Sequence, residues 1–247
     1  MAAAAHMPQP SPSSGSRPTC PRCARPLRTC LCPWVVPTAN RVPVLILQHP
    51  LETHHAKGSA TLLRLSLAHC EVWVGERFDE PRLQQALGAW GSACLLYPAT
   101  EPVTPPADDV TATAADPTVL GTASGLHRGE PTPGCLLVLD ATWRKSRKLL
   151  HLNPWLARLP RLSLPDPPPS RYRIRKAQQP HQRSTLEATA LALQWIEGDE
   201  ARYQPLLKAF EGFVAEREEL GAKAVKAGPP ETICIVFSNP GMSLKHA

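Results

Sequence analysis

The sequence predicts an α/β fold built on a mostly parallel sheet, and three observations support this class. Apolar runs of strand length alternate with segments of helical spacing along the chain. Three of the runs, 43–50, 93–98 and 134–143, are almost continuously apolar, as in strands that are covered on both faces. The prolines fall mainly between these elements, where they end strands and helices, in the clusters 8–18, 98–106, 131–133 and 165–169.

The first part of the chain divides into an arm, a cysteine segment and the start of the sheet domain. We expect a disordered arm over 1–19, a cysteine knuckle over 20–33 and one folded domain over 34–240. Within that domain the pattern predicts, in order, a strand at 43–50, a helix at 61–70, a strand at 71–76, a helix at 79–90 and a strand at 93–98. Residues 99–133 lack clear periodicity and are expected to form a long loop.

The second part of the chain continues the alternation of strands and helices. Ser184, followed three residues later by Glu187, predicts a capping box at the start of an amphipathic helix. The expected elements are a strand at 134–143, a helix at 143–152, a short strand at 160–165, a basic loop or edge strand at 166–177, helices at 185–198 and 201–221, and a last strand at 231–238.

Positive charge is concentrated in one part of the chain. The net charge is +6, but residues 140–183 alone contain eleven Lys or Arg against two Asp, so the rest of the chain is net negative. Such a stretch forms either a solvated basic face or a patch that follows the phosphates of a nucleic acid. No apolar run approaches the roughly 18 residues that span a bilayer, and the N-terminus lacks the pattern of a secretory signal. We therefore expect a cytoplasmic protein without a membrane partner.

Four of the eight cysteines form a C-x2-C-x6-C-x-C pattern, Cys20, Cys23, Cys30 and Cys32. Two closely spaced pairs can each direct two thiolates toward one tetrahedral ion, which predicts a structural Zn²⁺ with no open coordination position. A redox site and chance clustering are the alternatives, and disulfides are unusual in a reducing compartment. The other cysteines, Cys70, Cys94, Cys135 and Cys234, lie in or beside apolar runs and are interpreted as small buried hydrophobes.

Polar residues follow three of the predicted strands, where ligands bind in open α/β sheets. These are Gln48 with His49, Tyr97, and the run Asp140–Trp143. Asp140 could accept a proton or bind a ribose hydroxyl, or it could cap the following helix. Trp143 precedes four basic residues, which suits a stacked base with its phosphates, whereas core packing is the alternative.

The run LLVLDATWRKSRKLL (136–150) resembles the DTW-domain family, which is named for an Asp-x-Thr-Trp signature. Further blocks agree in the same order: CPRC…CLC (20–32), LILQHPLE (45–52), LLYP (95–98) and YRIRKAQQPHQRSTLEA (172–188). The resemblance extends from about residue 20 to about residue 197. Ala141 replaces a glycine that is frequent in the family, and 57–61 read Lys-Gly-Ser-Ala-Thr where Lys-Asn-Thr-Gly-Arg is common.

The resemblance implies a tRNA-uridine aminocarboxypropyltransferase. Such enzymes move the 3-amino-3-carboxypropyl group of S-adenosylmethionine to N3 of a uridine in tRNA and release methylthioadenosine. The implied fold is SPOUT-like, with a C-terminal trefoil knot, and residues 34–240 would form this transferase domain. The implied partner is tRNA, with no obligate protein partner. The alternatives are a SPOUT-type RNA methyltransferase and a non-catalytic zinc-dependent RNA-binding module.

The resemblance, together with the strand ends, assigns roles to individual residues. Asp140 is expected to act as a base toward N3 or to orient the uracil edge, Thr142 to hold substrate or backbone, and Trp143 to stack on the flipped base. The residues expected to bind RNA are Arg144, Lys145, Arg147, Lys148, Arg171, Arg173 and Arg175, of which Arg175 could instead hold the methionine carboxylate. The donor is expected near Gln48, His49, Tyr97, Pro98, Ser184, Thr185, Leu186 and Glu187.

Overall fold

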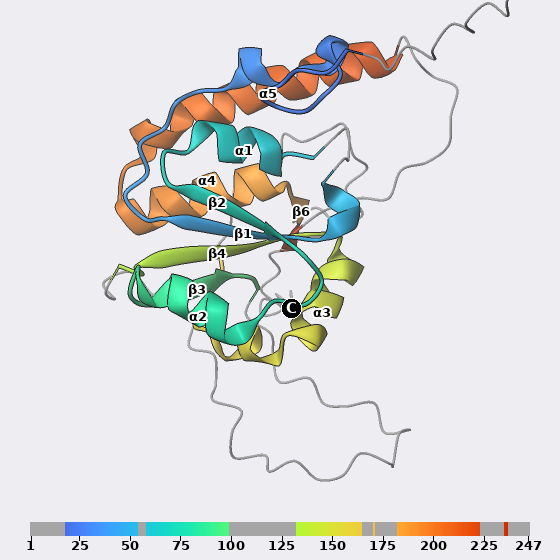
Figure 1. Cartoon of the computed structure of the whole chain (residues 1–247). Coiled ribbons are helices and arrows are strands. Elements are labelled where there is room, and N and C mark those ends of the chain that lie inside the picture. Colours follow the sequence, from blue (N-terminus) through green and yellow to red (C-terminus); the bar gives the residue numbers. More distant parts are fainter. Residues whose placement is uncertain are drawn as a thin grey trace, which may run out of the picture.

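A computed structural model describes residues 18–53, 58–98, 132–164, 170, 182–222 and 235–236 of the chain. Its centre is a five-stranded sheet in the order β2-β1-β4-β3-β5, and every neighbouring pair is parallel (Figure 1). The strands are β1 (Val44–Gln48), β2 (Cys70–Val74), β3 (Ala93–Leu96), β4 (Cys135–Asp140) and β5 (Arg161–Leu162). The predicted α/β class with a mostly parallel sheet is confirmed. A separate antiparallel pair joins β6 (Gln182–Arg183) to β7 (Ile235–Val236).

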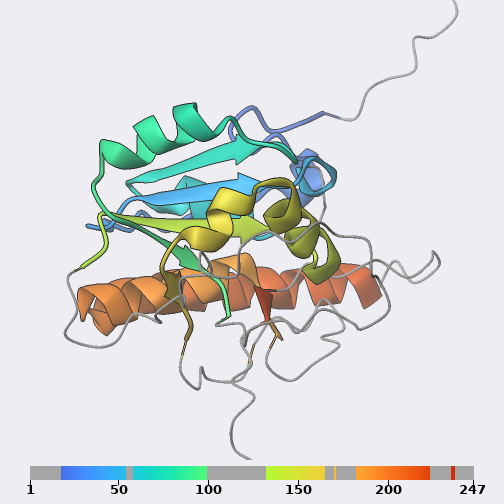
Figure 2. The same ribbon diagram turned by 90° about the horizontal axis from the view of Figure 1, so that it is seen from below.

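The three longest apolar runs of the sequence form the centre of the sheet. β4 lies between β1 and β3, and Gln48 at the end of β1 is in register with Asp140 at the end of β4. Leu96, the last residue of β3, is in register with Val138 of β4. The strands point the same way (Figure 2), so the polar residues that follow them meet at one edge of the sheet.

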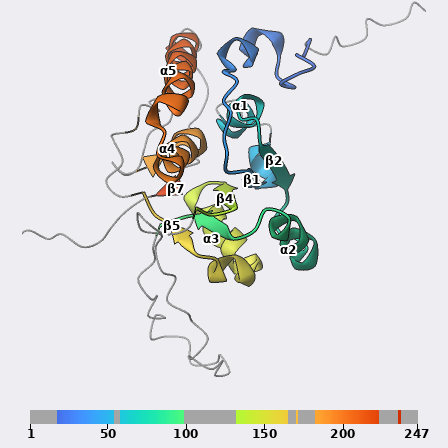
Figure 3. The same cartoon turned by 90° about the vertical axis from the view of Figure 1, so that its left-hand side faces the viewer.

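Helices cover both faces of this sheet (Figures 1 and 3). On one face lie α1 (Ala60–Ser66), α4 (Thr185–Glu197) and, outside α4, α5 (Glu200–Ala222). On the other lie α2 (Glu80–Gly88), α3 (Trp143–Leu152) and the 3-10 helix η5 (Pro154–Arg158). Alternate strand residues pack into the two layers: Val44, Ile46, Leu136 and Val138 toward α4, and Leu45, Leu47, Leu137 and Leu139 toward α3. All of these side chains are buried, which explains the continuous apolar runs.

The predicted helices form close to their expected positions. The capping box is confirmed: the Ser184 hydroxyl accepts from the backbone N–H of Glu187, and the Glu187 carboxylate accepts from that of Ser184. α4 ends at Glu197, and its C-cap residue Gly198 has a φ of +62°, which is readily accessible to glycine. The helix expected over 61–70 ends earlier, at Ser66, because Cys70 already begins β2.

Parts of the predicted organisation fall outside the described residues. These are most of the arm over 1–19, the loop over 99–133 up to residue 131, nearly all of 166–177, Cys234 and most of the last strand. Thr19 is described and pairs with Pro26 in an isolated bridge. Within the described part of the chain, no helix combines the length and apolarity needed to cross a bilayer.

Candidate active site and metal site

Asp140 joins three elements at the carboxyl edge of the sheet. Its side chain is 1% exposed, and each carboxylate oxygen accepts a hydrogen bond. Oδ2 accepts from Nε2 of Gln48 at 2.7 Å, and Oδ1 accepts from Oγ1 of Thr185 at 2.6 Å. Two donors on separate oxygens stabilise the ionised carboxylate. The carboxylate therefore links the ends of β1 and β4 to the first residue of α4.

The Asp-Ala-Thr-Trp run is the turn that leads from β4 into α3. Thr142 is the N-cap of α3, and its hydroxyl accepts from the backbone N–H of Lys145 at 3.3 Å. The alternative that Asp140 caps this helix is therefore wrong, because Thr142 holds that position. Ala141 is completely buried between them. The turn thus directs Asp140 toward α4 and begins α3 at Trp143.

Trp143 stacks on Tyr97, which follows β3. The ring centroids are 5.5 Å apart and the ring planes differ by 12°. Tyr97 is 2% exposed, whereas Trp143 is only half-buried. Burial raises the pKa of Tyr97, and its hydroxyl lies 3.4 Å from the Ser146 hydroxyl. Trp143 therefore packs on the core through Tyr97, as the core-packing alternative expects. Part of its indole stays accessible, so the predicted stacking on a base stays a prediction.

Arg161 of β5 extends this stack into the protein, and the sequence did not single it out. Its guanidinium carbon lies 5.4 Å from the centre of the Tyr97 ring, a cation–π distance. Nη1 donates to the backbone carbonyl of Pro98 at 3.1 Å. Arg161 is 6% exposed, and this burial lowers its pKa. The buried guanidinium of Arg161 thus packs against the Tyr97 ring, on which Trp143 stacks.

Ion pairs with two glutamates hold the lysines of α3. Lys145 Nζ lies 3.1 Å from Oε1 of Glu52, whose side chain is almost fully buried. Lys148 Nζ lies 2.7 Å from Oε2 of Glu76, and this hydrogen bond lowers the pKa of Glu76. Arg144 and Arg147 lie on the same helix and are exposed. Of the four basic residues that α3 contributes to the predicted RNA-binding set, Arg144, Arg147 and Lys148 are exposed, whereas Lys145 is half-buried.

His49 is held in one tautomer at the carboxyl edge of the sheet. Nε2 lies 2.7 Å from Oε1 of Glu76, and Nδ1 accepts from the backbone N–H of Leu51 at 3.2 Å. A nitrogen that accepts carries no proton, so Nε2 carries the proton and donates to Glu76. The imidazole is 2% exposed. Its ring nitrogens are thus both occupied by neighbours from the carboxyl edge.

The start of α4 is buried against the same edge. Ser184, Thr185, Leu186 and Glu187 are all buried, and Pro98 is buried as well. The backbone N–H of Leu186 donates to the Ser59 hydroxyl at 3.3 Å, and the Ser170 hydroxyl donates to the Glu187 carboxylate at 2.9 Å. Of the residues predicted to hold the donor, Gln48 and Thr185 contact the Asp140 carboxylate, and the backbone N–H of His49 donates to the Asp140 carbonyl. Arg171, Arg173 and Arg175 lie outside the described residues.

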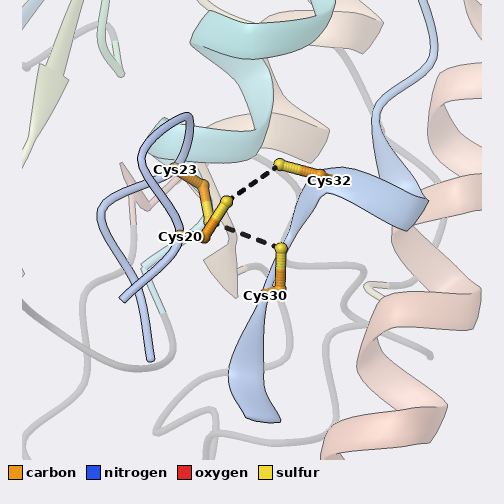
Figure 4. A group of neighbouring side chains, drawn as sticks. All are labelled: Cys20, Cys23, Cys30 and Cys32. Carbon is orange, nitrogen blue, oxygen red and sulfur yellow. Dashed lines mark hydrogen bonds between the residues drawn. The ribbon is translucent and has the colours of Figure 1, made fainter. Parts of the chain in front are cut away.

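The four knuckle cysteines come together as predicted (Figure 4). The sulfurs of Cys20 and Cys32 are 3.6 Å apart, those of Cys23 and Cys30 are 3.7 Å apart, and all four lie within 4.8 Å of one another. Zn–S bonds of about 2.3 Å in a tetrahedron separate the sulfurs by about 3.8 Å. The cysteines are free, so these distances fit a metal ion and not disulfides.

Backbone hydrogen bonds and burial shift the pKa values of the knuckle thiols in opposite directions. N–H groups of Cys23 and Arg22 point at Cys20 and lower its pKa to about 6. Burial, followed by the neighbouring thiols, raises the pKa of Cys32 to about 12. Four thiols in such proximity need a cation to ionise together, which agrees with a metal-binding role. The expectation that Cys94 and Cys135 are buried hydrophobes is confirmed, whereas Cys70 is only half-buried.

The sequence missed several residues of the site, namely Ser59, Glu52, Glu76 and Arg161. Glu76 had a usable signal, because it follows β2 at the edge where the other polar strand ends lie. Glu52 lies in a motif that the sequence singles out, but nothing in the pattern pairs it with Lys145 across 93 residues. Arg161 looked like one of many basic residues in 140–183.

Comparisons with known proteins identify a family and several relatives of this chain. The DTW domain matches residues 17–218. The mouse protein tRNA-uridine aminocarboxypropyltransferase 2 is 32% identical over 216 residues, which cover 84% of this chain and 66% of the relative, just under two thirds of its length. The Drosophila melanogaster protein of the same name is 30% identical over 200 residues, covering 78% of this chain and 72% of that relative. Arabidopsis thaliana tRNA-uridine aminocarboxypropyltransferase A is 28% identical over 142 residues, 56% of this chain and 52% of its own.

No solved structure matches the chain. The match to the DTW domain nevertheless includes the cysteine group, all five strands of the sheet and the Asp140–Trp143 turn. The chain therefore belongs to the DTW domain family.

Proposed function

We propose that this protein transfers the 3-amino-3-carboxypropyl group of S-adenosylmethionine to N3 of a uridine in tRNA. The observation that carries the proposal is the meeting of Asp140 and Trp143 at the carboxyl edge of the sheet, with Gln48, Tyr97 and Thr185 around them. Relatives that are about 30% identical over most of the chain bear the name of this activity. The basic helix α3 supplies the positive charge that a tRNA substrate requires.

The reaction exchanges one bond at the γ-carbon of the methionine moiety. N3 of the uracil loses its proton and attacks this carbon, the N3–C bond forms, and the C–S bond breaks. The sulfur keeps the electron pair of that bond and leaves as neutral methylthioadenosine. Because the sulfonium activates its three carbons alike, the protein has to orient the γ-carbon toward N3, and alignment of this kind lowers a barrier by several kcal/mol.

We propose that Asp140 orients the site rather than acting as the base. Its carboxylate is 1% exposed and already accepts from Gln48 and Thr185. In this role Asp140 fixes the Gln48 amide and the start of α4, and the N3 proton goes to solvent. In the alternative role the N3 proton goes to Asp140 itself. The two roles differ in what an asparagine at this position would do.

Trp143 provides the surface for the uracil. Tyr97 covers one part of the indole and fixes its orientation, so the accessible part can stack on a base that leaves the RNA stack. Arg144 and Arg147 would contact phosphates beside it, because they are exposed on the helix that begins at Trp143. We extend this role to Arg171, Arg173 and Arg175 on the family resemblance.

We further propose that the donor is held where the carboxyl ends of the central strands meet α4. The residues concerned are Gln48, His49, Tyr97, Pro98, Ser184, Thr185, Leu186 and Glu187. A SPOUT-like fold with a trefoil knot in the C-terminal part of the chain would provide the rest of this site. Zn²⁺ bound by the four cysteines would be structural, because four thiolates leave no position for a substrate.

The test is a reaction of the full chain with unmodified tRNA and S-adenosylmethionine, followed by mass analysis of nucleosides and of the released donor fragment. We expect aminocarboxypropyl-uridine and methylthioadenosine in equal amounts. Methylated nucleosides with S-adenosylhomocysteine would replace this proposal by the methyltransferase alternative. RNA binding without any product would favour the non-catalytic zinc-dependent module.

A further inference from the structure

The cysteine knuckle, residues 20–33, is built into the core of the sheet domain and does not stand apart from it. Leu31 is completely buried, and Cys20 and Cys23 are buried in the same hydrophobic cluster as the inner faces of α1, α4 and α5. The indole N–H of Trp34, directly after the knuckle, donates to the carboxylate of Glu216 on α5 at 3.0 Å. A metal that organises this segment therefore also organises its contacts with three helices.

Arg25 connects the knuckle to the loop before α1. Its Nη2 donates to the backbone carbonyl of Gly58 at 2.8 Å, across 33 residues of sequence. Arg25 lies between the two cysteine pairs in the sequence, and it is half-buried. Arg22 and Arg28, on the same knuckle, are exposed. Arg25 is thus the arginine of this segment that bonds to the backbone before α1, whereas Arg22 and Arg28 lie at the surface.

Gly58 is followed by the residue that contacts the start of α4. Ser59 is buried, and its hydroxyl accepts from the backbone N–H of Leu186 at 3.3 Å, while its carbonyl accepts from the N–H of Leu63 in α1. Leu186 follows Thr185, whose hydroxyl donates to Asp140. A continuous path of hydrogen bonds and adjacent residues therefore runs from Arg25 to the carboxylate at the centre of the candidate site.

We infer that Arg25 is a positioning residue, through which the metal-bound knuckle fixes the Gly58–Ser59 backbone and thereby the start of α4. Loss of the Arg25–Gly58 bond would release Ser59, and Ser59 would then hold Leu186 and Thr185 less firmly. The consequence is weaker binding of the donor, since the start of α4 is proposed to surround it. That last consequence rests on the proposed function, whereas the effect on the backbone does not.

The test compares Arg25→Ala with Arg28→Ala in the full zinc-loaded chain. Both variants remove one positive charge from the knuckle, so a difference between them reports the Gly58 contact and not charge. Hydrogen exchange of the Leu186 and Leu63 amides is the first measurement, and we expect roughly tenfold faster exchange in Arg25→Ala with no change in Arg28→Ala. Calorimetry with S-adenosylmethionine is the second, and we expect about fivefold to tenfold weaker binding in Arg25→Ala alone. Arg25→Lys, which can still donate to Gly58, should recover part of both effects.

Two further measurements keep the inference falsifiable. Zinc content shows whether Arg25→Ala still folds its knuckle, and Ser59→Ala breaks the same path outside the knuckle, so it should speed exchange at Leu186 with zinc fully retained. Equal exchange at Leu186 in Arg25→Ala, Arg28→Ala and the unaltered chain would overturn the inference. So would an equal loss of RNA affinity in both arginine variants without a change in exchange, because the knuckle would then be an RNA contact. If the unaltered chain does not bind S-adenosylmethionine, the proposed function fails, and the exchange measurement still decides the role of Arg25.

Discussion

Thr185 donates a 2.6 Å hydrogen bond to Asp140 across 45 residues of sequence, and this bond ties the first residue of α4 to the last residue of β4. The second oxygen of the same carboxylate accepts from Gln48. One buried carboxyl group thus holds two of the elements that are proposed to surround the donor. The chemical role of Asp140 is therefore inseparable from its structural role, unless variants are chosen that change only one of them.

Asp140→Asn separates the two roles. The asparagine carbonyl can still accept from Thr185, and its amide can donate to Gln48 if the Gln48 amide turns to present its oxygen. If Asp140 orients the site, we expect this variant to retain transfer within about tenfold of the unaltered enzyme, whereas Asp140→Ala loses it. If Asp140 is the base, both variants should lose roughly a hundredfold or more in kcat. Single-turnover kinetics with saturating tRNA make this comparison.

Trp143→Ala should weaken transfer by removing the stacking surface. Stacking of a base on an aromatic side chain is worth about 1–3 kcal/mol, so kcat/KM should fall roughly tenfold to a hundredfold. Trp143→Phe keeps a ring on Tyr97 and should recover most of the loss. Trp73→Phe, at a half-buried tryptophan on β2, serves as the control for a general effect of replacing an indole. Unchanged kcat/KM in Trp143→Ala would refute stacking as the role of this residue.

The basic residues of α3 should divide into two groups. Arg144→Ala and Arg147→Ala should each weaken tRNA binding and reduce the dependence of log Kd on log salt by about one unit, because each removes one phosphate contact. Lys145→Ala instead leaves the Glu52 carboxylate buried without its lysine and should lower the free energy of unfolding by about 2–3 kcal/mol. Salt titrations of tRNA binding and urea denaturation measure the two effects. The same salt slope in all three variants would contradict the division.

Removal of the metal should disturb the helical layer around the knuckle. If the four thiolates bind Zn²⁺ as proposed, a chelator removes the ion that would hold Cys20, Cys23 and Leu31 in the core. We expect a lower melting temperature and faster exchange in α1 and α5, both reversed when Zn²⁺ is added back. Metal analysis of the purified protein should give one zinc per chain. Full retention of the melting temperature after complete removal of zinc would show that the knuckle folds without it.

Gly212 allows Trp34 to lie against α5, and a methyl group there should not fit. A Cβ at Gly212 would lie 2.2 Å from Cζ3 of the Trp34 ring, so the ring would have to move away from Glu216. Gly212→Ala should lower the free energy of unfolding by about 1–3 kcal/mol, as overpacking does. Gly88→Ala is the matched control, because a Cβ at that last residue of α2 meets nothing within 4 Å. Chemical denaturation compares the two, and equal stabilities would contradict the packing argument.

The fold and the centre of the site could be predicted because both depend on local patterns. Continuous apolar runs identified β1, β3 and β4, and the polar residue that ends each run identified Gln48, Tyr97 and Asp140. The spacing of the four cysteines was enough to predict that their sulfurs lie together. The order of strands, in which β1 lies between β2 and β4, could not be read from the pattern, because it depends on how the crossovers pack.

The contacts that hold the site residues in place could not be predicted, because they join residues that are distant in the sequence. The sequence predicts Lys145 as an RNA ligand and gives no sign of its ion pair with Glu52. His49 looks like a free polar residue until Glu76 occupies its Nε2. Arg161 and Arg25 are ordinary basic residues in the sequence, and only packing gives them Tyr97 and Gly58 as partners. Each of these pairs depends on the tertiary structure.

The most direct test of the proposed activity uses S-adenosylmethionine that is labelled separately in its methyl group and in its carboxyl group. Incubated with the full chain and unmodified tRNA, the carboxyl label should enter the RNA at uridine and the methyl label should leave with methylthioadenosine. Trp143→Ala should reduce the amount of carboxyl label that enters. Methyl label in the RNA, with the carboxyl label left on S-adenosylhomocysteine, would contradict the account.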